Sequence, residues 1–109
     1  MIKINVMYPV TEGAGFDLDY YCNKHIPMVA GLLGSACKGI HVESGLCGGE
    51  PGRPARFEVM TGILFERLAD YESSFAAAAG VLMADIPNFT TIQPWVEVTD
   101  VCVDQRESE

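Results

Sequence analysis

The chain has 109 residues, of which 49% are hydrophobic, a net charge of −8 at pH 7 and a pI of about 4.5. This length predicts a single domain over residues 1–109, with a core of about 2–103 and a polar tail over 104–109. The acidic balance argues against nucleic acids and anionic membrane surfaces as partners, because phosphate binding requires a basic stripe. A chain this short buries only about two-thirds of the surface that its unfolded form exposes, so a ligand pocket would be easier to support at a subunit interface.

The hydrophobic pattern predicts six elements in the order βαββαβ. They are a strand over 2–8, a helix over about 17–33, strands over about 38–47 and 56–65, a helix from about 68–70 to 83, and a strand over about 91–103. Pro27 lies inside the first helix, where its ring crowds the preceding turn, so we expect a kink or a break just after His25.

This order predicts an α+β, ferredoxin-like fold, in which two helices cover one face of a four-stranded antiparallel sheet. Alternation in the third strand predicts that one face carries Phe57, Val59, Thr61, Ile63 and Phe65. We expect the face away from the helices to carry Met7, Met60, Leu64 and the valines of the last strand. An apolar face of this size requires a partner. Two such sheets packed face to face would close a barrel with the helices outside, so a homodimer is predicted.

The first helix carries a histidine in the middle of its apolar face. At about 100° per residue, His25 projects from the side that includes Leu18, Tyr21 and Val29. One interpretation is a structural histidine, hydrogen-bonded to a carbonyl or a Tyr hydroxyl. The other is a catalytic one, because Tyr21 lies one turn earlier, where the side chains can meet. An apolar setting also favours the neutral imidazole, the form that accepts a proton.

Cysteine usage indicates an intracellular protein without a metal site. Cys22, Cys37, Cys47 and Cys102 form no CxxC pair and have no spacing typical of zinc ligands. The chain opens on a strand pattern and not on a basic region followed by an apolar run, so no secretory signal is predicted. No segment approaches the ~20 apolar residues of a membrane helix. We expect a cytoplasmic protein with reduced thiols.

Two segments resemble the EthD family. Asp19-Tyr-Tyr-Cys-Asn-Lys-His25-Ile-Pro-Met-Val has the family's aromatic pair, basic residue, His and x-Pro near the start of the first helix. Phe75-Ala-Ala-Ala-Ala-Gly-Val-Leu-Met-Ala-Asp85-Ile-Pro-Asn-Phe-Thr looks like its second helix and following turn. The resemblance covers about 2–103 and implies a dimeric α+β barrel. The matching motif positions are Tyr20, Tyr21, Lys24, His25, Pro27, Asp85, Pro87 and Asn88.

The family is named after a gene associated with degradation of ethyl tert-butyl ether, where the protein accompanies a haem monooxygenase system. Relatives by fold include cofactor-free monooxygenases, polyketide cyclases, lactone isomerases, dehydratases and haem-binding enzymes. Because one fold hosts many chemistries, this likeness says little about the reaction.

The first functional hypothesis is a small-molecule catabolic enzyme without a cofactor, of oxidoreductase, isomerase or cyclase type. It would act on a small apolar or aromatic molecule in a pocket between the first helix and the sheet. His25 would be the general acid or base and Tyr21 its orienter or a donor. Asp85 or Asn88 could bond the second imidazole nitrogen. The residues expected to contact substrate are Tyr20, Met28, Asp85, Asn88 and Trp95.

Two other functions stay open. The chain could be a non-catalytic accessory or ligand-binding dimer that serves a partner oxygenase, because His25 is the only titratable group well placed in the predicted interior. His25 could instead bind haem iron, although no second ligand shows itself by spacing. Trp95, which follows Pro94, also fits a packing residue, and His41, which shares a strand with Glu43, a structural one.

Overall fold

A computed structural model describes residues 1–106 and confirms the α+β, ferredoxin-like arrangement. The strands are β1 Ile2–Pro9, β2 Gly39–Ser44, β3 Phe57–Phe65 and β4 Trp95–Asp100, and the helices are α1 Leu18–Tyr20, α2 Ile26–Leu33 and α3 Leu68–Asp85. A π-helical turn, Tyr21–His25, joins α1 to α2, and short 3-10 turns, Gly34–Ala36 and Ile86–Asn88, follow α2 and α3. The predicted tail over 104–109 lies partly outside the described residues.

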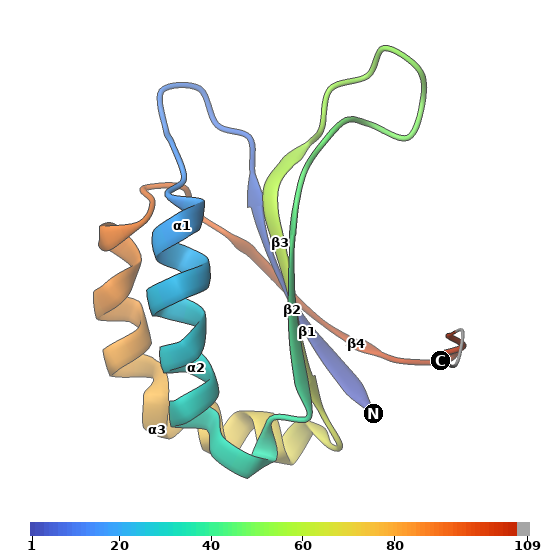
Figure 1. Cartoon of the computed structure of the whole chain (residues 1–109). Coiled ribbons are helices and arrows are strands. Elements are labelled where there is room, and N and C mark those ends of the chain that lie inside the picture. The colour runs from blue at the N-terminus through green and yellow to red at the C-terminus, as the bar shows by residue number, and fades with distance from the viewer. Residues whose placement is uncertain (107–109) are drawn as a thin grey trace.

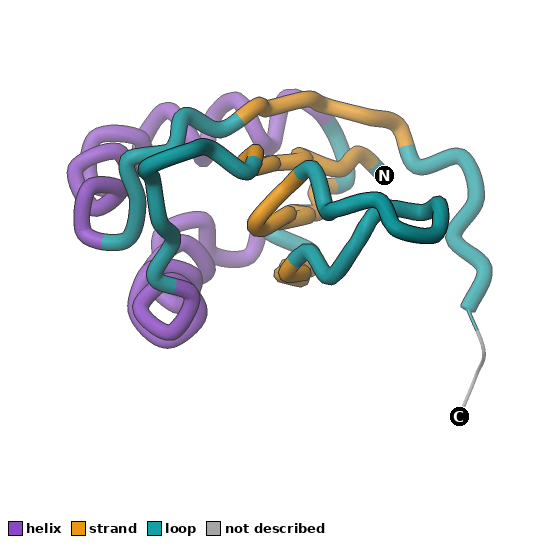
Figure 2. The backbone as a smooth tube through the Cα atoms, turned by 90° about the horizontal axis from the view of Figure 1, so that it is seen from above, coloured by secondary structure: helices purple, strands orange, loops and turns teal. Residues whose placement is uncertain are grey.

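The four strands form one antiparallel sheet in the order β2-β3-β1-β4. The helices lie on one face of this sheet and α2 packs against α3 (Figure 1). Seen from above, helices and strands form two layers (Figure 2). Within residues 1–106 no helix covers the opposite face of the sheet, and none is long and apolar enough to cross a membrane.

The first helix is continuous over Leu18–Leu33 but is not α-helical throughout. Of the kink or break expected just after His25, the break does not occur. Instead, the Ile26 N–H bonds to the Tyr21 carbonyl, one residue further back than in an α-helix. This wide turn directly precedes Pro27, which has no N–H to contribute to the helix. Both ends of the turn, Tyr21 and His25, are buried.

The two main helices start in different ways. The Asp17 carboxylate accepts a hydrogen bond from the Tyr20 N–H at 3.1 Å and caps the first helix. At the start of α3, Arg67 makes no capping bond, and its guanidinium pairs with Asp70 at 3.2 Å. Asp70 lies in the first helical turn, where a negative charge is favourable.

The strand register corrects the predicted distribution of valines on the sheet. Val96 pairs with Val6, and Val98 pairs with Ile4. Directly opposed residues share a face, and Ile4 is buried beneath the helices. The valines of β4 therefore lie on the helix-covered face and not on the open one.

The register also corrects the position of Phe57. The pairing of β1 with β3 shifts between Tyr8 and Pro9, which marks a bulge, and Phe57 pairs with Pro9. The Phe57 ring contacts Trp95 edge-on, with ring centres 5.5 Å apart. Trp95 pairs with Met7 on the open face. The bulge thus moves Phe57 away from the face predicted for it.

Two strands are shorter than predicted. β2 ends at Ser44, where its ladder with β3 ends, and residues 45–56 form a long protruding loop (Figure 1). β4 begins only at Trp95, directly after Pro94. Proline has no N–H for a ladder bond, which explains why the strand does not start earlier.

Two clusters of buried side chains form the core between sheet and helices. The first is aliphatic apart from one ring: Ile4, Val29, Leu33, Phe65, Ala78 and Leu82. The second is mostly aromatic: Tyr8, Tyr21, Val59, Phe89 and Ile92. The aromatic cluster lies beside the buried histidine of the first helix, because His25 contacts the Phe89 ring at 4.6 Å between centres.

Candidate functional site

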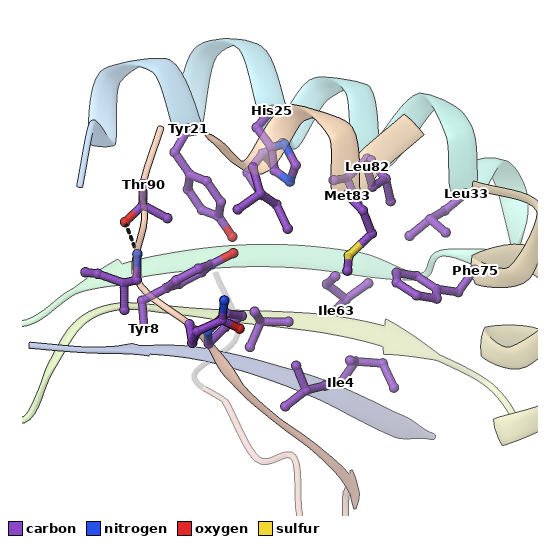
Figure 3. Close-up of a pocket in the computed structure, with 18 of the residues that line it drawn as sticks. Ile4, Tyr8, Tyr21, His25, Leu33, Ile63, Phe75, Leu82, Met83 and Thr90 are labelled. Carbon is purple, nitrogen blue, oxygen red and sulfur yellow. Dashed lines mark hydrogen bonds between the residues drawn. The ribbon is translucent and has the colours of Figure 1, made fainter. Parts of the chain in front are cut away.

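A cavity of about 670 Å³ lies between the helices and the helix-covered face of the sheet, in the size range of small-molecule sites. Figure 3 shows the side chains that line it. Two of them, Met83 on α3 and Val96 on β4, are 61% and 52% exposed. The cavity therefore opens between α3 and β4. All of its lining residues belong to one chain, and it lies between the helices and the sheet, as predicted.

His25 forms part of the cavity wall and is only 6% exposed. Its Nδ1 lies 2.8 Å from Oδ2 of Asp85 at the end of α3. An ionised carboxylate can only accept a hydrogen bond, so Nδ1 carries the proton. The bond to Asp85 thus fixes the tautomer and leaves Nε2 as the nitrogen available to a ligand.

Asp85 is held ionised by three donors. Tyr20 donates its hydroxyl to Oδ1 at 2.7 Å, Asn88 donates its amide to the same oxygen at 2.9 Å, and His25 donates to Oδ2. These hydrogen bonds, led by that of Tyr20, lower the pKa of Asp85 to about 2. The same bond raises the pKa of Tyr20, which stays protonated as a donor.

Aromatic rings hold the imidazole in place. Tyr21 stacks on His25 at 5.3 Å between ring centres and 16° between planes, and Phe89 contacts it at 4.6 Å. The Tyr21 hydroxyl lies 2.6 Å from the Thr61 hydroxyl on β3. Tyr21 therefore orients His25 through its ring, while its hydroxyl is anchored to the sheet. Burial raises the pKa of Tyr21 and of the neighbouring Tyr8, so both phenols stay protonated.

The segment after α3 brings Asp85 to the first helix. Phe16 and Thr90 form an isolated antiparallel bridge, and the Asp17 N–H bonds to the Phe89 carbonyl at 2.8 Å. The Thr90 hydroxyl donates to the Gly15 carbonyl at 2.7 Å. These bonds tie residues 86–90 to the N-terminus of the first helix, about two turns before His25.

The EthD domain model matches residues 16–93, which is more than half of the chain. This chain belongs to the EthD family. The matched range contains both halves of the hydrogen-bonded pair, His25 and Asp85.

Solved structures agree with this EthD assignment. An EthD-like protein from Ralstonia eutropha JMP134 is 40% identical with a TM-score of 0.91, over 95% of this chain and 94% of that one. An EthD family protein from Bacillus halodurans C-125 is 16% identical with a TM-score of 0.62, over 92% and 97%. A dimeric protein of ferredoxin-like fold from Bacteroides fragilis NCTC 9343 is 13% identical with a TM-score of 0.50, over 91% and 94%. The latter two show the fold alone. A comparison with curated proteins gave no match.

The structure does not bring every residue of the predicted EthD site together. Tyr20, Tyr21, His25, Asp85 and Asn88 form one connected group, in which Tyr21 and His25 line the cavity and the other three lie behind them. The other predicted contacts lie elsewhere: Met28 packs against the aliphatic core, and Trp95 lies on the open sheet face, as does His41. Within residues 1–106, no three His, Cys, Asp or Glu side chains gather in a way that could hold a metal.

Three residues of the EthD site were not predicted from the sequence. Phe89 and Thr61 contact the His25 and Tyr21 side chains, and Tyr8 lines the cavity beside them. Tyr8 had a detectable signal, because it ends an alternating apolar row in the first strand. Phe89 had one too, as part of the family-like segment after the second helix. Thr61 had none, since its role depends on the position of Tyr21.

Asp85 should make the folded EthD protein sensitive to acid. Its pKa is about 2 when folded, against an ordinary value of 3.8. Ionised Asp85 therefore stabilises the fold above about pH 4, and this contribution is lost as the pH falls from about 4 towards 2. We expect the urea midpoint, followed by circular dichroism, to fall across this window, and to fall less in Asp85→Asn. Equal decreases of the urea midpoint in the wild type and in Asp85→Asn would show that Asp85 is not the source of the acid sensitivity.

Proposed function

We propose that this chain is a small-molecule catabolic enzyme in which His25 transfers a proton to or from an apolar ligand without a bound cofactor. The observation that carries the proposal is the hydrogen bond from Asp85 to His25, a residue in the wall of a largely apolar cavity. A buried imidazole with a fixed tautomer and one free nitrogen is suited to general acid–base catalysis. The enclosing apolar side chains favour ligands of the same character.

The proposed step begins with a ligand whose acidic carbon faces Nε2 of His25. Nε2 takes the proton, and the bonding electron pair moves into an adjacent carbonyl, which becomes an enolate. The imidazolium is stabilised by the Asp85 carboxylate, and the hydroxyls of Tyr8 and Tyr21 supply hydrogen-bond donors at that end of the cavity. Return of the proton to another position gives an isomerase reaction, whereas attack of the enolate carbon on a second carbonyl of the same ligand, with transfer of the proton to the resulting alkoxide, gives a cyclase reaction. An oxidoreductase reaction would need oxygen as a further reactant.

The proposal includes a homodimer formed through the open sheet face. This face carries Met7, Phe57, Met60, Leu64 and Trp95. Trp95 is 60% exposed in one chain, and apolar patches of this kind mark interaction sites. A cytoplasmic location is also proposed, supported by the four cysteines, all of which are free thiols.

Deuterium exchange tests the proposed proton transfer. The protein is incubated in D₂O with a panel of small cyclic and aromatic ketones, and loss of the proton signal beside the carbonyl is followed by NMR. We expect exchange faster than that caused by buffer, and faster than that caused by heat-denatured protein. Absence of acceleration across the panel would count against the enzyme. Native mass spectrometry of the same preparation tests the dimer and detects a co-purified ligand.

The second candidate is a non-catalytic carrier that serves a partner oxygenase. It is favoured by the scarcity of titratable groups in the cavity wall, where, among residues 1–106, the titratable side chains are His25 and tyrosines. A carrier would bind the same ligands but give no exchange. Retention of full affinity in a His25→Gln variant would support this candidate, because apolar contacts would then dominate binding.

A further inference from the structure

Polar and apolar side chains are sorted along the cavity. Tyr8, Tyr21 and Thr90 lie at one end, next to His25 (Figure 3). The opposite end is formed by aliphatic and aromatic side chains: Ile4, Leu33, Ile63, Phe75, Leu82 and Met83. A ligand that fills the cavity therefore meets a cluster of hydrogen-bonding side chains beside His25 and, towards the other end, the phenol of Tyr71 beside Phe75.

The polar end has no side chain with a permanent positive charge. No Lys or Arg lines the cavity within residues 1–106, and the ionised Asp85 carboxylate lies directly behind the imidazole. A ligand carboxylate or phosphate placed there would lose its hydration without gaining a cation, and would also be repelled by Asp85. These features disfavour anionic ligands.

The groups that are present match a carbonyl oxygen. The hydroxyls of Tyr8 and Tyr21 point towards one another below His25 (Figure 3), and burial keeps both phenols protonated as donors. Thr61 shares a hydrogen bond with the Tyr21 hydroxyl, which holds that group at the sheet. A carbonyl accepts hydrogen bonds and donates none, so it suits the one O–H that this group of hydroxyls leaves free, with its neighbouring carbon placed next to His25.

From this sorting, we infer that the ligand is an uncharged ketone whose carbonyl sits at one end of an extended apolar body. The carbonyl is bound beside Tyr8, Tyr21 and His25, and the apolar body extends between the sheet and α3 towards Phe75 and Met83. This inference rests on the proposed function and specifies its substrate class.

Binding of four matched probes tests the inference. They are β-tetralone, its hydrocarbon tetralin, the corresponding tetralin carboxylate, and cyclohexanone, which lacks the second ring. Each is titrated into the full-length protein and Kd is obtained from NMR chemical shifts. We expect β-tetralone to bind about tenfold or more tightly than the carboxylate, because the carboxylate is desolvated without a counter-charge. It should also bind more tightly than tetralin and cyclohexanone. A carboxylate that binds as tightly as the ketone would overturn the inference.

Two Tyr→Phe variants test at which end of the cavity the carbonyl group of the ligand binds. Tyr8→Phe removes a donor at the polar end, whereas Tyr71→Phe makes the same change where Tyr71 contacts Phe75. We expect Tyr8→Phe to weaken β-tetralone by about 2- to 10-fold relative to tetralin, the effect of one hydrogen bond, and Tyr71→Phe to leave this ratio unchanged. Equal effects of the two variants would refute the placement.

The binding data and the exchange data separate the two proposals. Ketone-selective binding without exchange would retain the ligand class and reject the enzyme. If the protein accelerates exchange but binds ketones no more tightly than carboxylates, the enzyme proposal is kept and the proposed ligand class is rejected.

Discussion

Replacement of His25 by Gln is expected to lower the rate of deuterium exchange by about 10²- to 10⁴-fold, the usual contribution of a positioned acid–base group. Gln has no group that takes up a proton at neutral pH, but its amide can still donate to the Asp85 carboxylate. The carboxylate therefore keeps a partner, and the fold should survive. The measurement is the initial exchange rate with the best ketone of the panel, together with a thermal melt.

The matched control for this variant is His41→Gln. His41 is the other histidine of the chain; its side chain is 53% exposed on the open sheet face and lies 3.9 Å from Glu43. We expect His41→Gln to exchange at the wild-type rate. If His25→Gln also exchanges at that rate, His25 is a structural residue. A lower melting temperature with unchanged exchange would lead to the same conclusion.

Replacement of Asp85 by Asn should lower the exchange rate by about 10²-fold or more, because an amide in this position can present its NH₂ to Nδ1 and stabilise the wrong tautomer. A comparable Asp→Asn change beside a catalytic histidine costs about 10⁴-fold in serine proteases. Asp85 acts through His25, so it is a positioning residue. Its signature is spectroscopic: the imidazole nitrogen shifts should report a change from the Nδ1–H to the Nε2–H form.

Asp70→Asn is the control for this second variant. Asp70 lies on the same helix, α3, and is also paired, but with Arg67 at the start of the helix. It should keep both the exchange rate and the imidazole spectrum of the wild type. An Asp85→Asn protein that is slow but retains the Nδ1–H signature would contradict the tautomer explanation, and would leave only a general effect on packing.

The sequence was sufficient to predict the fold because local patterns carry that information. Two such patterns are the period-two alternation in Ile2–Pro9 and the amphipathic pattern around His25, and both depend only on neighbours along the chain. In any compact arrangement, the apolar side of each element is then buried. The inward direction of His25 follows for the same reason. The family-like segments then indicated that Asp85 and Asn88 belong to the same site.

The faces of the sheet could not be assigned from periodicity alone. Alternation shows which residues of a strand share a face, but not which face, since a shift of one residue exchanges them. The pairing of Val96 with Val6 and the bulge beside Phe57 are properties of two strands together. For this reason the valines of β4 were predicted on the open face, although they lie on the helix-covered face. Phe57 was predicted on the helix-covered face, although it lies on the open one.

The local sequence determined the elements of this protein, the helix that carries His25 and the direction in which that side chain points. The tertiary structure alone decided that Asp85, sixty positions away, bonds to Nδ1. It also decided that the Tyr21 hydroxyl bonds to Thr61, and that one chain forms the cavity. Such contacts depend on how residues 86–90 return to the first helix. No pattern of neighbouring residues contains that path, because it is set by packing between segments far apart in the chain.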